Sequence, residues 1–292
     1  MKKGTKKQIH FWLFLLPMLL IFINVIIIPL GIGIVYSFTN WDGFSMAGSK
    51  FIGFHNYIKA FSDEKFITAF ILTIKYTAIM VILVNVVGLS LALLVTKKMK
   101  TSNILRSIFF LPNLIGGLIL GFIWQFVFTK LFEFLGTSLH LKGIFFNWID
   151  DPKMAFWALI IVGTWQMAGY VMVIYIAGIQ SIPDEVLEAA SIDGANALKT
   201  FGSIVFPLII PSFTISVFIT LSNSFKQYDT NLSLTNGGPY GSTELVTMNI
   251  FNTAFKSNDY AIAQAKSLIF FIVIMILTVL QVYITKKREV EM

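Results

Sequence analysis

The sequence predicts an all-α membrane protein with six transmembrane helices. Composition, long apolar runs and the placement of basic residues lead to this prediction. Apolar residues make up 56% of the 292 residues, charged residues only 13%, and the mean hydropathy is +0.78. A soluble domain usually carries about 25% charged residues, because polar atoms must cover much of its surface. This chain has too few of them, so its composition indicates a lipid environment.

Six apolar runs are long enough to cross the hydrocarbon core of a bilayer as helices, which takes about 20 residues. The fifth run has Pro207 and Pro211 in its first turns, where proline is tolerated because the first N–H groups of a helix have no partner within it. The six runs are residues 11–36, 67–95, 108–128, 156–179, 204–221 and 267–284.

Lysine and arginine predict how the spans are oriented. With the N-terminus in the cytoplasm, the inner segments hold twelve basic residues and the outer loops hold nine. The inner ones cluster beside helix ends, where the positive-inside rule applies most strongly, so both chain ends are expected in the cytoplasm. The inner set is Lys2, Lys3, Lys6, Lys7, Lys97, Lys98, Lys100, Arg106, Lys199, Lys286, Lys287 and Arg288. The outer set is Lys50, Lys59, Lys65, Lys130, Lys142, Lys153, Lys226, Lys256 and Lys266.

One polar segment, residues 181–196, interrupts the alternation of spans and loops. Ser181 is expected to cap a short helix. A proline follows it, and then Asp184 and Glu185, whose charges suit the positive end of a helix. Gly194 is expected to end the helix, as glycine commonly does just after a helix C-terminus. The segment therefore predicts a short cytoplasmic helix between the fourth and fifth spans, too polar to cross the bilayer.

One face of this short helix is apolar, since Ile182, Val186, Leu187 and Ala190 recur at helical spacing. A helix resting on the bilayer surface is the alternative interpretation. It is disfavoured because the segment is acidic, whereas interfacial helices are typically rich in lysine and arginine.

The sequence contains none of the usual catalytic or cofactor-binding patterns. It has no cysteine, which excludes disulfides and thiolate chemistry, and no glycine-rich phosphate loop ending in Lys-Ser/Thr, so ATP is not expected on this chain. His10, His55 and His140 lie far apart, and no metal site is expected from them. The basic residues form no stripe interleaved with aromatic residues, so nucleic-acid binding is not indicated.

All fifteen acidic residues lie outside the six apolar runs. Proton-coupled carriers usually need carboxylates or histidines within the membrane, so the pattern argues for another source of energy. A sodium-coupled carrier stays open, because sodium sites can be built from carbonyls and hydroxyls. Lys75 is the one charge well inside a run, and we interpret it as a lysine that extends to the membrane surface.

Polar and aromatic residues within or beside two spans are candidates for a translocation path. Aromatic faces and amide groups suit sugars, which present apolar C–H faces ringed by hydroxyls. Polar contacts between helices and an aromatic belt at the membrane surface are the alternative. The candidates are Trp165, Gln166 and Tyr170 in the fourth span and Asn223, Gln227 and Tyr228 at the end of the fifth.

Several glycines within the spans are interpreted as places of close helix packing, because a residue without a side chain lets two backbones approach. They are Gly117 and Gly121 in the third span and Gly163, Gly169 and Gly178 in the fourth.

The polar segment and the start of the fifth span resemble the coupling motif of bacterial ABC importer permeases. That motif is Glu-Ala-Ala, three residues, Gly, nine residues and Ile-x-Leu-Pro. Here Glu188-Ala189-Ala190 is followed by Gly194, directly after Asp193, and then by Ile204-Val205-Phe206-Pro207. The only departure is Phe206 in place of leucine, which exchanges one large apolar group for another.

Further stretches resemble the carbohydrate, or maltose-type, branch of these permeases. The resemblance covers about residues 11–285 and is to the first of the two permease types in such systems. The matching stretches are Tyr36-Ser37-Phe38-Thr39-Asn40-Trp41, Phe51-Ile52-Gly53-Phe54-His55-Asn56-Tyr57 and Leu234-Thr235-Asn236-Gly237-Gly238-Pro239, with Gly241-Ser242-Thr243 after the last.

The resemblance implies a type I ABC importer permease in a bacterial inner membrane, with both ends in the cytoplasm. Its expected partners are a second permease subunit, two ATPase subunits that hold ATP and magnesium, and an extracytoplasmic sugar-binding protein. The chain itself is expected to be no enzyme and to bind no cofactor. The residues expected to couple it to an ATPase are Glu188, Ala189, Ala190, Asp193, Gly194, Ile204 and Pro207.

The resemblance also implies a division of the chain. Residues 1–66 hold an N-terminal cytoplasmic segment, the first span and an outer loop, residues 67–285 form the permease domain, and residues 286–292 are cytoplasmic. The sequence does not identify the sugar, and the sugar site could lie on the partner permease. A gradient-driven carrier of small polar solutes is the alternative function, and a scaffold or sensor is disfavoured because it would need no coupling helix.

Overall fold

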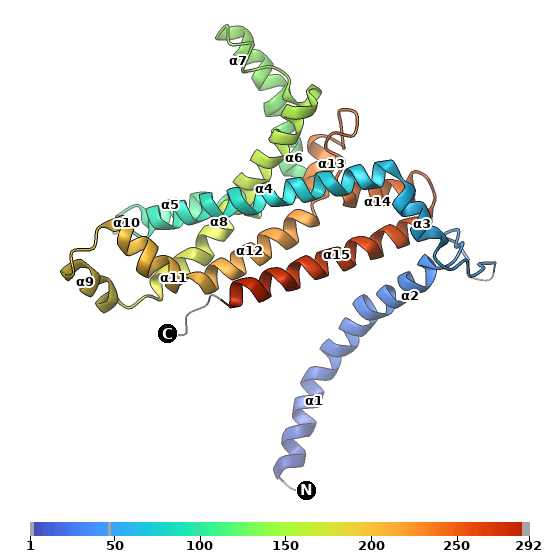
Figure 1. Cartoon of the computed structure of the whole chain (residues 1–292), viewed down its shortest axis with the longest axis horizontal. Coiled ribbons are helices and arrows are strands. Elements are labelled where there is room, and N and C mark those ends of the chain that lie inside the picture. Colours follow the sequence, from blue (N-terminus) through green and yellow to red (C-terminus); the bar gives the residue numbers. More distant parts are fainter. Residues whose placement is uncertain (1–2, 46–47, 98, 288–292) are drawn as a thin grey trace. The chain divides into compact units, whose positions relative to one another are not determined.

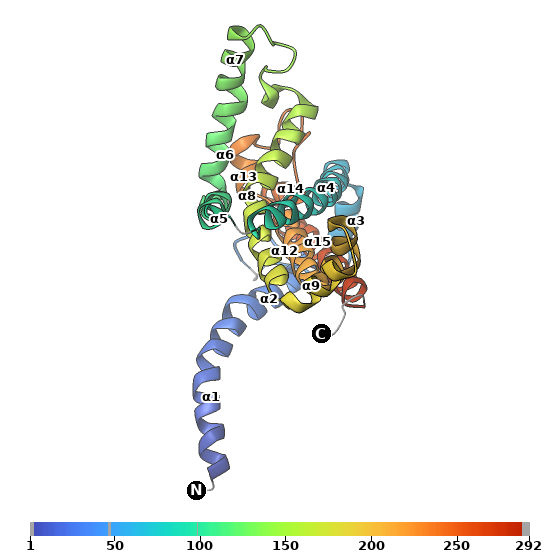
Figure 2. The ribbon, with the colours of Figure 1, turned by 90° about the vertical axis from the view of Figure 1, so that its left-hand side faces the viewer.

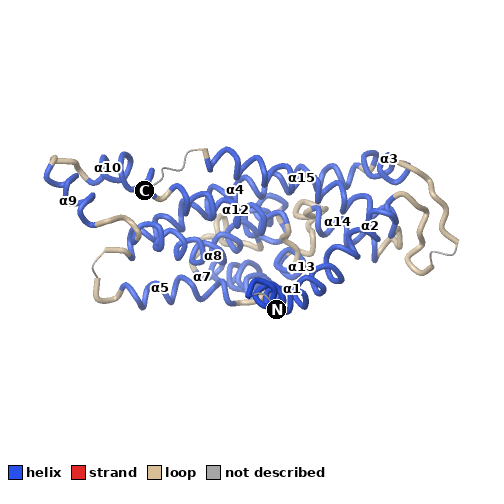
Figure 3. Tube along the Cα trace, turned by 90° about the horizontal axis from the view of Figure 1, so that it is seen from below, coloured by secondary structure: helices blue, strands red, loops and turns tan. Residues whose placement is uncertain are grey.

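The structure, a computed structural model, describes residues 3–45, 48–97 and 99–287, and this part of the chain is built from helices without a β-strand (Figure 3). A single isolated bridge joins Thr39 to Phe51. The all-α prediction is confirmed. Of the basic residues used to predict the orientation, Lys2, Lys98 and Arg288 lie outside the described residues, as do most of residues 286–292.

Most helices follow one another with short connections, and the longest ones are residues 38–54 and 235–245 (Figure 1). They are α1 (Lys3–Phe22), η1 (Ile23–Ile27), α2 (Ile28–Ser37), α3 (His55–Ser62), α4 (Glu64–Val95), α5 (Ser102–Phe110), η2 (Leu111–Leu114), α6 (Gly117–Phe126), η3 (Val127–Leu131), α7 (Phe132–Ser138), η4 (Trp148–Asp150), α8 (Pro152–Gln180), α9 (Asp184–Ile192), α10 (Ala197–Thr200), η5 (Phe201–Val205), α11 (Phe206–Leu208), α12 (Ile210–Phe225), α13 (Asp229–Leu234), α14 (Val246–Phe255) and α15 (Tyr260–Lys286).

Among the described residues, five helices are long and apolar enough to cross a membrane, and a bent pair of helices makes a sixth candidate. The bent pair is Ala197–Leu208 with Ile210–Phe225. The five helices are Phe11–Ser37, Glu64–Val95, Gly117–Ser138, Pro152–Gln180 and Tyr260–Lys286. The six predicted spans are therefore present, and the first, second, fourth and sixth agree with their predicted ranges to within a few residues at most ends.

The third span lies further along the chain than predicted. Residues 108–116 belong to α5, to the turn η2 and to a break before α6, because Pro112 and Gly116 interrupt the helix where the apolar run continues. The helix then runs on from Gly117 to Ser138, with α6 and α7 in line (Figure 2). Lys130, predicted in an outer loop, and Glu133, predicted outside the spans, lie within it.

The fifth span begins earlier than predicted and is bent by 70° at Ile209. Pro207 and Pro211 lie on either side of the bend instead of in the first turns. Proline lacks the N–H of an interior helical bond, and its ring clashes with the carbonyl four residues earlier. Two prolines four residues apart therefore account for the break, which Ile209 fills as a fully buried side chain.

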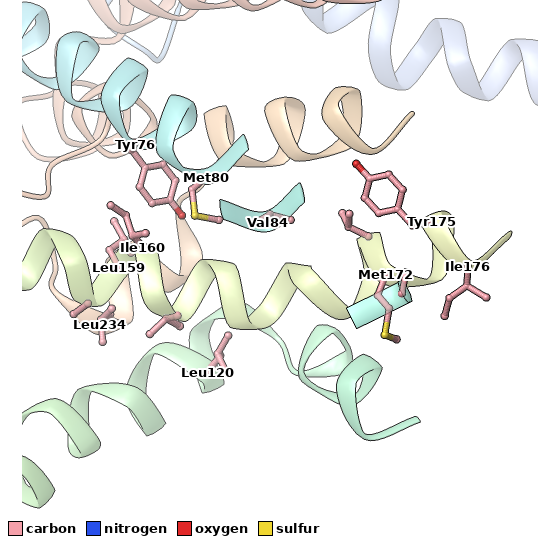
Figure 4. Close-up of a cluster of buried hydrophobic side chains, with 14 of the residues drawn as sticks. Tyr76, Met80, Val84, Leu120, Leu159, Ile160, Met172, Tyr175, Ile176 and Leu234 are labelled. Atoms are coloured by element: carbon pink, nitrogen blue, oxygen red, sulfur yellow. The ribbon is translucent and has the colours of Figure 1, made fainter. Parts of the chain in front are cut away.

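Two compact units divide the chain: residues 1–64 with 250–271, and residues 65–249 with 272–292. In the second unit, α4, α8 and α12 run side by side (Figure 1), and a cluster of buried apolar side chains from α4, α6, α8 and α13 fills the space between them (Figure 4). Tyr76, Met80, Leu159, Met172 and Tyr175 are among its largest members.

The glycines interpreted as packing positions lie at close contacts within the second unit. A Cβ atom at Gly117 or Gly121 would overlap α13, one at Gly163 would overlap Tyr76 and Met80, and one at Gly178 would overlap Ser212. At Gly169 the added atom would overlap the backbone carbonyl of Phe109. The interpretation of these glycines as close-packing positions is confirmed.

In the first unit, a buried ion pair joins segments far apart in sequence. Lys266 Nζ donates to Asp63 Oδ2 at 2.6 Å and to Thr253 Oγ1 at 2.8 Å, and Lys266 is 1% exposed. Lys266 was predicted in an outer loop, but α15 begins at Tyr260 and includes it. Apolar neighbours dominate the hydropathy around Lys266, so its pairing with Asp63 cannot be read from the sequence.

Candidate functional site

The polar segment between the fourth and fifth spans forms a short helix, α9, as predicted. In Figure 1, α9 and α10 lie at the same end of the second unit as α5. The basic residues predicted to be cytoplasmic at that end include Lys97, Arg106 and Lys199. Arg106 Nη2 donates to the carbonyl of Val95 at 3.2 Å, which satisfies one of the last carbonyls of α4.

The expected cap at Ser181 is wrong. Ser181 ends α8 instead, because its hydroxyl donates back to the carbonyl of Gly178 at 2.7 Å. The next residue precedes Pro183, which disfavours helical backbone there, and α9 begins only at Asp184. Asp184 and Glu185 then occupy the first turn, where the helix dipole favours negative charge.

The apolar face of α9 packs on its own chain. Ile182 and Ala190 are buried, and Leu187 packs against the apolar cluster of the second unit. Val186, expected on the same face, is 37% exposed. Ala190 therefore serves to seat α9 on the chain, whereas Glu188 lies on the exposed side.

Gly194 ends α9 in a Schellman motif. Its φ angle is +74°, its N–H donates to the carbonyl of Ser191 at 3.1 Å, and the N–H of Ala195 donates to the carbonyl of Ala190 at 3.0 Å. Left-handed backbone costs other residues about 1–2 kcal/mol. The predicted role of Gly194 as the helix terminator is confirmed.

The next helix, α10, begins with a cap that sequence reasoning missed. Asn196 Oδ1 accepts from the backbone N–H of Lys199 at 2.9 Å. Asparagine two residues after a terminating glycine is the signal that could have identified it. The turn between α9 and α10 is thus fixed by a glycine on one side and a capped helix start on the other.

Two large apolar side chains stand exposed beside this turn. Ile192, in the last turn of α9, is 85% exposed, and Leu198, in α10, is 83% exposed. Neither was singled out from the sequence. With the exposed Glu188, Ala189 and Asp193, they give the α9–α10 turn a surface of mixed apolar and acidic character. We call this surface the α9–α10 tip.

Ile204 and Pro207 lie beyond the tip, in the first half of the bent span, and both are partly buried. The bend that follows Pro207 packs on the end of α8, since a Cβ at Gly178 would lie against Ser212 and Ile209. The segment that carries α9 and α10 is therefore held to the bundle at both of its ends.

The three path candidates of α8 face the start of the third span. Trp165 lies edge-on to Trp124 at 5.5 Å between ring centroids, and Tyr170 lies 6.5 Å from Phe110. Gln166 Nε2 donates to the carbonyl of Ile115 at 3.0 Å. That carbonyl is available because the helix is interrupted between η2 and α6.

The path candidates at the end of α12 and just after it form a second group. Asn223 is exposed, and Gln227 and Tyr228 are partly buried. The carbonyl of Gln227 accepts from Thr247 Oγ1 at 2.6 Å. Burial, followed by the neighbouring carboxylate of Asp229, raises the pKa of Tyr228 above its ordinary value.

Residues 115–117, where the helix is interrupted, contact both α8 and the start of α13. On one side Ile115 accepts the hydrogen bond from Gln166, and on the other a Cβ at Gly117 would lie against Asp229 and Thr230. Irregular backbone within a membrane protein is tolerated where it is buried in protein or lines a cavity. The broken helix, which the sequence did not predict, thus contacts Gln166 on one side and the start of α13, directly after Tyr228, on the other.

The described residues include no group of three or more histidines, cysteines or carboxylates that could hold a metal ion. Of the histidines considered, His55 begins α3 and His140 lies in the left-handed turn after α7. The side chain of His10 lies outside the described residues.

Comparison with known proteins identifies the family. Residues 84–290 match the family described as "Binding-protein-dependent transport system inner membrane component". The chain belongs to this family. It is therefore a multi-pass transport component of a cell membrane and not an enzyme.

Relatives of the chain are similar over nearly their whole length. The chain is 50% identical over 290 residues to the "Probable starch degradation products transport system permease protein AmyD" of Thermoanaerobacterium thermosulfurigenes, covering 99% of this chain and 98% of the relative. It is 34% identical over 279 residues to the "Multiple sugar-binding transport system permease protein MsmF" of Streptococcus mutans, covering 96% of each.

A solved structure has the same fold. A chain of a bacterial ABC transporter involved in the import of the acidic polysaccharide alginate superposes with a TM-score of 0.82, covering 98% of each chain at 20% identity. The predicted type I importer permease architecture is confirmed by this likeness.

Proposed function

We propose that the chain is one of two permease subunits of an ATP-driven sugar importer. A second, related permease completes the translocation path, two ATPase subunits bind the cytoplasmic side, and an extracytoplasmic protein delivers the sugar. ATP and magnesium are bound by the ATPase subunits, and this chain holds no cofactor of its own.

Two findings support sugar as the cargo. The relatives that are 50% and 34% identical are named for starch degradation products and for multiple sugars. The path candidates also combine aromatic rings with amide groups, which suits a ligand that has apolar faces and many hydroxyls.

A delivering protein is supported by a structural relative. A bacterial alginate ABC transporter, solved in complex with an alginate pentasaccharide-bound periplasmic protein, matches the chain with a TM-score of 0.81 at 20% identity. The family description likewise refers to binding-protein-dependent transport.

The observation that carries the coupling proposal is the α9–α10 tip. Ile192, on the short polar helix α9, and Leu198, at the start of α10, are large, apolar and exposed at 85% and 83%. Burial of two such side chains in a partner is favourable by roughly 1.5–3 kcal/mol each. Glu188, on the same exposed surface, offers a carboxylate to a basic side chain of the ATPase.

Force applied at the tip would reach the spans on both sides. On one side α9 follows α8 through only three residues, and on the other α10 leads directly into the bent span. Gly178, near the end of α8, also packs against the bend at Ile209 and Ser212. A rigid helix held at both ends transmits rigid-body motion to the bundle.

Replacement of Ile192 and Leu198 by glutamine tests the docking role. The double variant, purified with a tag from membranes that contain the other subunits, is expected to retain less than a tenth of the co-purifying ATP hydrolysis of the unmodified chain. Lys199→Gln is the matched control, because Lys199 is an exposed neighbour of Leu198 in α10. Equal ATP hydrolysis in the double variant and the control would contradict docking at the tip.

Trp165→Ala tests the path. It is expected to change the rate of ATP-driven sugar uptake or the preference among sugars, because Trp165 presents a ring beside the interrupted third span. Trp157→Ala is the control, since Trp157 lies on the same helix and is exposed to nearly the same extent, 45% against 44%. Identical uptake in both variants, repeated for Gln166→Ala and Asn223→Ala, would place the sugar site on the partner permease.

A further inference from the structure

A polar cavity of about 480 Å³ lies in the first unit, apart from the predicted path. The loop after α2, the first turns of α3 and the turn between α14 and α15 form its walls. By the count of spans, these segments lie on the side of the membrane opposite to α9. Its volume is within the range of about 300–1,000 Å³ usual for small-molecule sites.

Aromatic rings form one wall of this cavity. Trp41 stacks on Tyr36 at 4.0 Å between ring centroids and 22° between planes, and it lies 5.8 Å from Tyr260 at a tilt of 58°. Gly43, with a φ angle of +94°, lies so close to Tyr260 that an added Cβ would overlap the ring. The positions of Trp41 and Tyr260 are thus set by contacts outside the cavity.

Charged and polar groups line the other walls. The carboxylates are Asp42 and Asp259, and the donors include Lys59 and His55, one turn apart on α3. Asp42 Oδ1 accepts from the backbone N–H groups of Phe44 and Ser45 at 3.0 and 3.3 Å. These hydrogen bonds lower the pKa of Asp42 below its ordinary value and keep it ionised.

Buried polar contacts hold the walls together. Asn56 Nδ2 donates to the carbonyls of Ser37 and Thr39 at 2.9 and 2.7 Å, which ties α3 to the loop after α2. The Lys266 pair with Asp63 and Thr253 ties the end of α3 to α14 and α15. These hydrogen bonds fix all three wall segments, so the cavity is preformed.

The charged, polar and aromatic groups that line the cavity indicate which class of ligand it can bind. A single cation or anion would be favoured by walls of one sign, but the lining of this cavity includes two carboxylates together with a lysine and an imidazole. A neutral molecule with many hydroxyls can donate to the carboxylates, accept from the lysine and place an apolar C–H face against Trp41.

We infer that this outer cavity binds one unit of a neutral saccharide, as a subsite at which an oligosaccharide contacts the permease before it enters the path. The inference rests on the proposed function, since it assumes that the chain imports sugars. Trp41 and Tyr260 supply the apolar contact, and Asp42, Asp259 and Lys59 bind hydroxyls.

Photo-crosslinking tests the subsite on the full importer complex. The probe is maltotriose that carries a diazirine at its reducing end, and mass spectrometry of the digested chain locates the label. The expected result is a label within residues 40–59 or 258–262 that excess unmodified maltotriose suppresses. Label confined to other residues, or label here that maltotriose does not suppress, would overturn the inference.

Two variants, one that removes a large side chain and one that keeps the side-chain size, distinguish loss of binding from a folding defect. Trp41→Ala removes the aromatic wall, and Asp259→Asn keeps the size of the side chain while removing its charge. Each is expected to reduce the label in the cavity at least fivefold, while the amount of ATPase subunit that co-purifies with the chain shows that the complex still assembles. Trp157→Ala, on α8 in the other unit, is expected to leave the label unchanged. Undiminished label in Asp259→Asn and Trp41→Ala would contradict the assignment of these residues.

ATP-driven uptake of maltotriose by the same complex, reconstituted in vesicles, separates the subsite from the proposed function. Uptake without suppressible label in the cavity would refute the subsite alone. Absence of uptake of maltotriose and of every other neutral sugar offered would contradict the proposed cargo, whatever the labelling.

Discussion

At the scale of single residues, Gly194 connects backbone conformation to the proposed coupling. Its φ angle of +74° and the Schellman bonds around it set the direction in which the chain leaves α9. Open space surrounds the position of an added Cβ, with no atom within 4 Å. A side chain at Gly194 would therefore act through backbone strain and not through a clash.

Gly194→Val is expected to lower ATP-driven uptake about tenfold, because strain of about 1–2 kcal/mol falls on the turn that orients the tip. Uptake by the reconstituted complex is the measurement. Gly202→Val is the control, since Gly202 also has open space around it but no left-handed backbone. Equal uptake by the two variants would show that the conformation of Gly194 is not needed for coupling.

The Lys266–Asp63 ion pair is expected to affect the stability of the chain. Lys266 is buried, so removal of Asp63 leaves a charge that is poorly solvated, and removal of Lys266 takes the cation from a carboxylate that is only partly solvated. Lys266→Ala is expected to destabilise the purified chain by about 3 kcal/mol, toward the low end for buried pairs because Asp63 is a third exposed. Thermal unfolding in detergent is the measurement.

Lys75→Ala provides the comparison, because Lys75 is an exposed lysine of α4. Its unfolding temperature is expected to match that of the unmodified chain. The double variant Lys266→Met with Asp63→Asn is expected to recover part of the lost stability, since it leaves no unpaired charge. Loss of stability in the double variant equal to that of Lys266→Ala would refute the ion pair as the cause.

At the scale of helices, α6 and α13 pack with almost no side chain between them. Gly117 and Gly121 bring the backbone of α6 against Asp229, Thr230 and Ser233, and Ser233 Oγ donates to the carbonyl of Asp229 at 2.9 Å. Gly121→Val is expected to destabilise the chain by about 1–3 kcal/mol through overpacking, measured as thermal unfolding.

Gly116→Ala is the matched control for this contact, because nothing lies within 4 Å of the added atom and the φ angle of Gly116 is −61°. An unfolding temperature for Gly121→Val equal to that of Gly116→Ala would contradict the close contact between α6 and α13.

Helix count could be predicted from the sequence, but two breaks could not be placed. Hydropathy follows apolar content, and that content continues through Leu111-Pro112-Asn113-Leu114, where the helix stops. The sequence places Pro207 and Pro211 in the first turns of the fifth span. Whether a proline starts a helix or bends it depends on where the helix begins. Here it begins at Ala197, after the cap at Asn196.

The candidate site was predicted where its signals are local. The role of Gly194 can be predicted from the preference for glycine at helix ends. The motif from Glu188 to Pro207 can be recognised from the spacing of its residues. The exposure of Ile192 and Leu198 and the pairing of Lys266 with Asp63, 203 residues away, depend on tertiary packing. No pattern within a short stretch of sequence encodes them.

At the scale of the whole molecule, the family match and the fold make the chain a membrane transport component, and the proposed function depends on an outside source of energy. The central claim is that ATP hydrolysis on partner subunits drives sugar import, and that the motion of these subunits reaches the chain at the α9–α10 tip. A chain that transports by a gradient would work without those subunits.

Uptake of labelled malto-oligosaccharide into vesicles tests this claim most directly. Vesicles that contain the complete complex, the binding protein and internal ATP are expected to accumulate sugar. Vesicles that contain the two permeases alone are expected to show none under a proton or sodium gradient. Gradient-driven uptake by the permeases alone, or ATP-driven uptake at the normal rate when Ile192 and Leu198 are both glutamine, would contradict the account.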